Sequence, residues 1–151
     1  MNIFVTDSST LACARMLDDK RVVKMVLETA QMLSTVAGGP YKPTHAKHPC
    51  TVWVGAARGN YVWTLGLFQC LILEYKFRYN KVHKCAELLS TFRTIPRFDV
   101  GPATEWANCS GFELGSVFQS YRECMNYKWL NDVRDPRWTR RGPPSWSLVK
   151  D

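Results

Sequence analysis

An apolar stretch from Tyr61 to Tyr75 constrains the fold more than any other feature of the sequence. Four small or polar residues interrupt it, so it falls short of the roughly 20 apolar residues that a membrane span requires. We therefore predict a long buried helix from about residue 60 to residue 79. Because this helix is apolar on nearly all sides, we expect it to be central, and Asn60 is a candidate for its N-cap.

Helical spacing of apolar residues predicts further helices around this one. They span residues 10–17, 18 or 19 to 36, 51–57, 82–92 and 115–130. An edge strand is one option for residues 2–5, and a proline-containing loop is expected at 94–102. Three prolines and no helical period make the tail at 134–151 irregular. The fold class is all-α or nearly so: one compact domain of five to seven helices, spanning 1–151, with an irregular basic C-terminal tail.

The charge balance indicates an anionic partner. Twenty lysines and arginines against 13 acidic residues give a net charge of +7. Nucleic acid or a nucleotide fits this charge, and plain solubility is the alternative. The N-terminus lacks a signal-peptide pattern and the six cysteines form no CxxC pair, so we expect a cytoplasmic protein with reduced thiols.

One face of the second predicted helix carries polar groups at helical spacing. Lys20, Lys24, Glu28 and Gln31 follow one another at intervals of four, four and three residues. Glu28 is our candidate general acid or base, and Lys24 a candidate nucleophile or charge stabiliser. Lys20 and Gln31 would contact substrate. The alternative is a solvated face with one Lys–Glu pair.

The loop between the second helix and the next one holds two of the three histidines. His45 and His48 are candidate proton carriers near neutral pH. They are equally well explained as ordinary loop histidines. If they are functional, they complete a site with Glu28 and Lys24.

Two His-x-Cys pairs raise the question of a metal. They are His48-Pro49-Cys50 and His83-Lys84-Cys85. Their spacing is not that of a zinc finger, and residues 83 and 85 point about 200° apart on a helix. The cofactor is left unknown, zinc is not favoured, and no metal ligand is predicted.

Glu74, Arg78 and His83 form another candidate group near the end of the long helix. Arg78 would hold a phosphate bidentately, and Glu74 would orient His83 or His45. A half-buried structural Glu–Arg pair is the alternative.

The tail interleaves arginine with tryptophan. Arg137, Trp138, Arg140 and Arg141 are candidates for contacts to a nucleic-acid backbone and for stacking on bases. The alternative is that the tryptophans pack on the core and the arginines face solvent.

Several segments resemble a group of small proteins encoded by tailed bacteriophages. They are Met1–Val5, Asp19–Met25 with Glu28–Gln31, His48–Trp53 and Glu74–Lys84. The resemblance covers residues 1 to about 90, and the tail is also similar. It implies a phage origin rather than an activity, and favours work on DNA, nucleotides or a host factor.

Pyrimidine-dimer glycosylases use the α-amine of a small N-terminal residue as their nucleophile. This chain begins Met1-Asn2, and a methionine before a bulky residue is ordinarily retained. The chain shows no match to that class's pattern, so we do not expect its mechanism here.

The sequence also lacks Walker, GxGxxG, HExxH, GxSxG and zinc-deaminase motifs. We therefore predict a phage-encoded helical protein that binds or acts on nucleic acid, through base or nucleotide modification or repair. The alternative is a non-catalytic protein that binds a host protein during infection. Catalysis and oligomeric state stay open.

Overall fold

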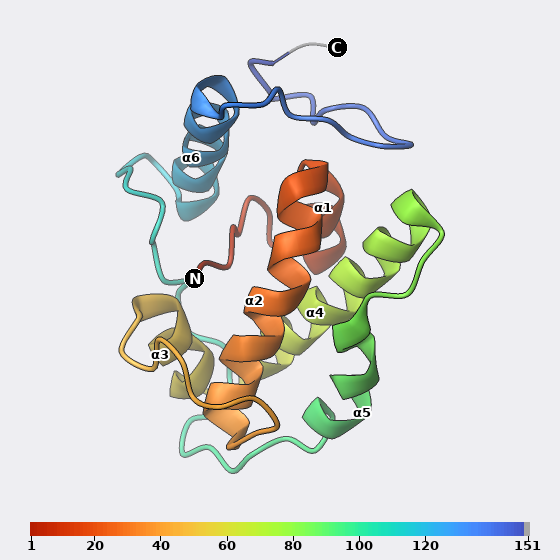
Figure 1. Cartoon of the computed structure of the whole chain (residues 1–151). Helices are drawn as coiled ribbons and strands as arrows, with labels where there is room; N and C mark the ends of the chain where they lie inside the picture. The colour runs from red at the N-terminus through yellow and green to blue at the C-terminus, as the bar shows by residue number, and fades with distance from the viewer. Residues whose placement is uncertain (150–151) are drawn as a thin grey trace.

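The computed structural model describes residues 1–149, and they form a helical bundle (Figure 1). Its elements are α1 (Thr10–Met16), α2 (Asp19–Ala37), α3 (Pro49–Ala56), α4 (Arg58–Tyr79), the 3₁₀ helix η1 (Lys84–Leu88), α5 (Leu89–Phe92) and α6 (Val117–Asn131). No strand occurs among the described residues, which confirms the helical fold class. The tail has no helix from residue 134 to 149, and residues 150–151 of the predicted tail lie outside the described part.

The edge strand expected at residues 2–5 is absent. The side-chain oxygen of Asn2 accepts hydrogen bonds from the backbone of Ile3 at 2.8 Å and Phe4 at 3.0 Å. Phe4 has a φ of 40°, which is outside the extended range. The segment is a local turn whose apolar side chains Ile3 and Val5 are buried.

The core forms where α2, α1 and α3 pack against α4. The face of α4 toward these helices is buried at Tyr61, Phe68 and Leu71, but Leu73 and Phe77 are exposed. Burial of α4 on all sides is therefore not observed, because neighbouring helices cover only one face. No helix within residues 1–149 is long and apolar enough to cross a membrane.

Helix ends follow local chemistry. Gly38 ends α2 in the left-handed conformation, with φ 81°, as expected for a glycine after a helix. Asn60 is not the N-cap of α4, which is Ala57. The buried Asn60 side chain instead donates to the backbone oxygen of Trp53 and accepts from the backbone of Thr104. It thereby ties the segment before α6 to the bundle.

Candidate functional site

Two amines lie on either side of the Glu28 carboxylate, on the middle of α2. The α-amine of Met1 is 3.4 Å from Glu28 Oε2. Lys24 Nζ, one helical turn before Glu28, is 3.1 Å from Oε1. The Glu28 side chain is only 11% exposed, whereas that of Lys24 is 62% exposed. The carboxylate therefore lies at the edge of the core, between the buried N-terminus and the exposed Lys24 side chain.

The local turn at residues 2–5 sets the position of the N-terminus. Asn2 also donates from its side-chain amide to the backbone oxygen of Cys109 at 3.4 Å. Figure 1 shows the N-terminus beside α3 and the segment that leads to α6. Burial of Ile3 and Val5 anchors the chain immediately after Met1. The hydrogen bonds of Asn2 and the burial of Ile3 and Val5 thus hold the α-amine against Glu28.

His48 lies near this pair and caps α3. Its Nδ1 accepts a hydrogen bond from the backbone N–H of Cys50 at 3.2 Å. Burial lowers the pKa of His48, and the positive charges of the N-terminus and His45 lower it further, while Glu28 opposes them. The lowered pKa favours the neutral form of the His48 ring at neutral pH. His45 is exposed, has a φ of 50°, and its Nδ1 lies 2.8 Å from the Thr44 hydroxyl.

The polar face of α2 is divided between two places. Lys24 and Glu28 belong to the amine cluster, but Lys20 Nζ lies 3.2 Å from Asp132 at the end of α6. Gln31 is half-buried, and its backbone oxygen accepts from the Thr35 hydroxyl. An open groove of about 910 Å³ between the start of α2 and residues 131–137 is lined by Lys20 but not by Glu28.

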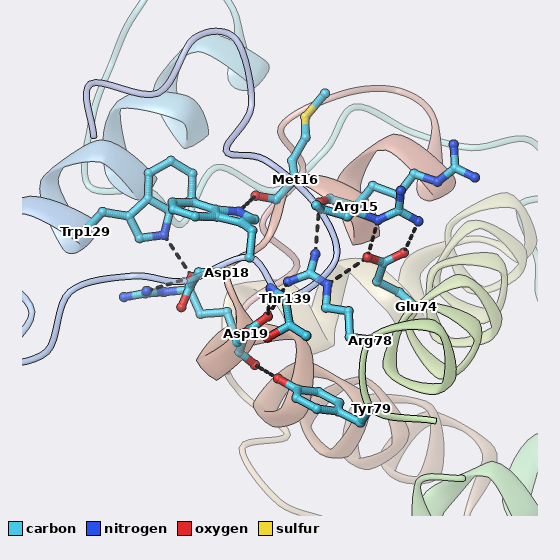
Figure 2. Close-up of polar contacts among 12 residues, drawn as sticks. Arg15, Met16, Asp18, Asp19, Glu74, Arg78, Tyr79, Trp129 and Thr139 are labelled. Atoms are coloured by element: carbon cyan, nitrogen blue, oxygen red, sulfur yellow. Dashed lines mark hydrogen bonds and ion pairs between the residues drawn. The ribbon is translucent and has the colours of Figure 1, made fainter. Parts of the chain in front are cut away.

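Glu74 and Arg78 lie in a buried ion-pair network (Figure 2). Arg78 donates to Glu74 at 2.7 Å, to Asp19 at 3.0 Å and to the backbone oxygen of Arg15 at 3.0 Å. Its side chain is 0% exposed. The guanidinium N–H groups of Arg78 are directed at protein oxygens. This is the geometry expected of a structural Glu–Arg pair rather than of a phosphate ligand.

Arg141 from the tail completes this network by donating two hydrogen bonds to Glu74, one at 2.8 Å. Burial alone would raise the pKa of the Glu74 carboxyl. The hydrogen bonds from Arg141 and Arg78 outweigh burial, and the pKa lies below its ordinary value. Glu74 is therefore charged at neutral pH and anchors the tail through Arg141.

The other tail residues divide into buried and exposed groups. Trp138 is buried, donates to the backbone oxygen of Met16 at 3.0 Å and packs edge-on against Trp129. Arg137 and Arg140 are exposed. Arg140 also donates to the backbone oxygen of Phe77 at 2.9 Å. The geometry leaves these two arginines accessible to phosphate and holds the Trp138 ring inside the protein.

His83 lies apart from these groups, as the N-cap of η1. Its Nδ1 accepts from the backbone N–H of Cys85 at 3.1 Å, and its ring packs edge-on against Tyr75. Burial lowers its pKa, and a hydrogen bond with the backbone of Val23 opposes this. No hydrogen bond joins it to Glu74 among the described residues.

A family model described as pyrimidine dimer DNA glycosylase matches residues 1–87, which is more than half of the chain. The chain belongs to this family. No curated protein matches, and no solved structure matches. The matched region contains Met1, Lys24, Glu28 and both loop histidines, and it ends before α6.

The family match corrects our expectation that the chain does not fit this class. That expectation rested on the size of the first residue. A retained methionine still carries an α-amine, and in this structure that amine contacts Glu28. Sequence reasoning did not consider the Met1 amine, which lies beside Glu28 in this structure. No local sequence pattern places this amine beside Glu28, because the contact depends on the fold.

Proposed function

We propose that this protein is a DNA repair glycosylase that removes pyrimidine dimers, with the Met1 α-amine as nucleophile and Glu28 as its acid–base partner. The observation that carries the proposal is the 3.4 Å contact between this amine and Glu28 Oε2. Membership of the pyrimidine dimer DNA glycosylase family supports the substrate class. Enzymes commonly use amines as covalent nucleophiles when an acid or base is adjacent.

The reaction begins when the neutral amine attacks C1′ of the damaged nucleotide. A C1′–N bond forms, the bond from C1′ to the base breaks, and its electron pair leaves with the base. The nitrogen then loses a proton and the sugar ring opens to an imine. Glu28 is positioned to accept protons from the amine and return them to the sugar oxygen, because it lies within contact distance of the nitrogen.

Lys24 is the other amine at the carboxylate. The Met1 α-amine is held in place by the turn at residues 2–5, whereas the Lys24 side chain is 62% exposed. We assign Met1 the nucleophilic role and Lys24 the role of stabilising negative charge near Glu28. His48 and His45 are proposed proton carriers at the same site. Lys20 and Gln31 extend the proposed contacts with substrate along α2.

DNA binding is proposed for the exposed basic side chains. Arg137 and Arg140 are exposed to solvent, and the net charge of +7 favours an anionic partner. The proposed setting is the cytoplasm of a phage-infected cell, a prediction that rests on the resemblance to phage proteins.

The direct test is cleavage of ultraviolet-irradiated duplex DNA by the wild type and by Glu28→Gln. Loss of an acid–base group predicts a fall in turnover of at least about 10²-fold, with the fold preserved by circular dichroism. Glu113→Gln is the matched control, because Glu113 is an exposed carboxylate outside the matched region. Full activity of Glu28→Gln would overturn the assignment of Glu28, and no activity in the wild type would overturn the function.

A further inference from the structure

Three metal-ligating side chains meet beside the N-terminus. One ring nitrogen of His48 and the sulfurs of Cys50 and Cys109 all lie within 4.8 Å of one another. His48 and Cys50 stand at the start of α3, and Cys109 comes from the segment before α6. The cluster thus joins two parts of the chain that are about 60 residues apart in sequence.

The distances between the His48 nitrogen and the two cysteine sulfurs suit an ion with tetrahedral coordination. Zinc binds thiolate sulfur at about 2.3 Å and imidazole nitrogen at about 2.0–2.1 Å, which places ligand atoms roughly 3.5–3.8 Å apart. Ligand atoms that lie within 4.8 Å of one another need to approach by at most about 1.3 Å to reach this geometry. Three protein ligands leave a fourth position for water.

The ligands are carried by a backbone that is already fixed. The N–H of Cys109 donates to the Tyr121 hydroxyl at 3.0 Å, and that hydroxyl donates to the backbone oxygen of Ala107 at 3.0 Å. Asn2 donates to the backbone oxygen of Cys109. The hydrogen bond from Cys50 to Nδ1 of His48 requires an unprotonated Nδ1, so this nitrogen carries a lone pair. Binding of an ion at Nδ1 would exchange this hydrogen bond for a bond to the ion.

We propose that His48, Cys50 and Cys109 form a binding site for a thiolate-preferring divalent cation, of which zinc is the biological example. Binding converts the two thiols to thiolates, and their two protons pass to solvent. The bound ion clips the segment before α6 to the start of α3, beside the turn that positions Met1. The sequence spacing alone paired His48 and Cys50 with His83 and Cys85, because the approach of Cys109 depends on the fold.

The other His-x-Cys pair supplies a matched control. His83 accepts a hydrogen bond from the backbone N–H of Cys85 at 3.1 Å, as His48 does from Cys50 at 3.2 Å. No third metal-ligating side chain joins His83 and Cys85 within residues 1–149. Cys85→Ser therefore removes a thiol from the same local motif and leaves the proposed site intact.

The experiment titrates the reduced, metal-free full chain with cobalt(II), whose thiolate complexes show a sulfur-to-metal charge-transfer band. We expect saturation at one cobalt per chain, loss of the band when zinc is added, and a rise in melting temperature with zinc. Cys109→Ser should lose the band and the rise in melting temperature, and Cys85→Ser should keep both. Cys109 is only half-buried, so its variant is expected to fold, which circular dichroism checks.

Absence of the band in the wild type would overturn the proposal, and so would a band that persists in Cys109→Ser or disappears in Cys85→Ser. The readout is spectroscopic and independent of DNA cleavage. Failure of this proposal therefore leaves the assignment of Glu28 and Met1 untouched, and the reverse also holds. The two proposals meet only at His48, because a bound ion would leave the proton-carrier role to His45.

Discussion

Replacing Arg78 with methionine tests whether this arginine holds the fold together or binds substrate. Methionine keeps much of the apolar stem and removes all three hydrogen bonds, to Glu74, to Asp19 and to the backbone of Arg15. Glu74 and Asp19 remain, and the Glu74 side chain is only 3% exposed. The variant therefore leaves a buried carboxylate with Arg141 as its one remaining cation.

The expected loss of stability in Arg78→Met follows from the burial of its ion pair with Glu74. Removing one partner of a buried ion pair costs about 3–5 kcal/mol of stability. A chain of this size loses about 2–4 °C of melting temperature per kcal/mol, so Arg78→Met should melt about 6–20 °C below the wild type. Lys20→Met is the matched control, because the Lys20 side chain is 66% exposed in its pair with Asp132. A surface pair contributes about 0–1 kcal/mol, so Lys20→Met should melt within about 4 °C of the wild type.

Calorimetry and urea denaturation measure these differences, and DNA affinity is measured well below the melting temperature of each variant. We expect Arg78→Met to lose stability and keep its affinity for DNA. The structural account of Arg78 is refuted if its stability falls no further than that of Lys20→Met while DNA affinity collapses. Arg78 would then be the phosphate ligand that its sequence position suggested.

Three further predictions concern charge. The folded protein holds the pKa of Glu74 below its ordinary value of 4.5. The ionised Glu74 carboxylate therefore stabilises the fold fully above pH 4.5, and this stabilisation is lost as the pH falls through the folded-state pKa. Acid unfolding should be less steep in Glu74→Gln. Arg137 is exposed, so Arg137→Gln should reduce the slope of log affinity for DNA against log salt by about 1, measured by fluorescence anisotropy. Lys24→Met should slow cleavage of irradiated DNA but leave imine formation intact. Borohydride trapping of the imine measures this, and loss of trapping would make Lys24 the nucleophile.

Helical periodicity was sufficient to predict much of the fold. The predicted segment at 10–17 is α1, and the segment from 18 or 19 to 36 is α2, because its apolar residues recur at helical spacing and Gly38 follows them. The segment at 82–92 is instead divided into η1 and α5, because the His83 ring caps a tight turn at Cys85. Residues 2–5 read as a strand from composition alone, but the Asn2 side chain supplies backbone hydrogen-bond partners within the segment itself.

The candidate site was only partly predictable. Lys24 and Glu28 are one helical turn apart, so their contact follows from sequence spacing. The contact of Met1 with Glu28 depends on how the chain returns to α2, which no local pattern specifies. The docking of Arg141 on Glu74 is likewise a contact between distant segments, 67 residues apart. Composition alone could not decide whether the tail arginines face solvent or the core.

The measurement that tests the central claim most directly is borohydride trapping on dimer-containing DNA, followed by mass spectrometry of the cross-linked peptide. A check of the intact mass establishes that Met1 is the first residue of the protein used. The account predicts an adduct on the α-amine of Met1, abolished or strongly reduced in Glu28→Gln and retained in Lys24→Met. An adduct on Lys24, or efficient trapping on Met1 without the Glu28 carboxylate, would contradict it.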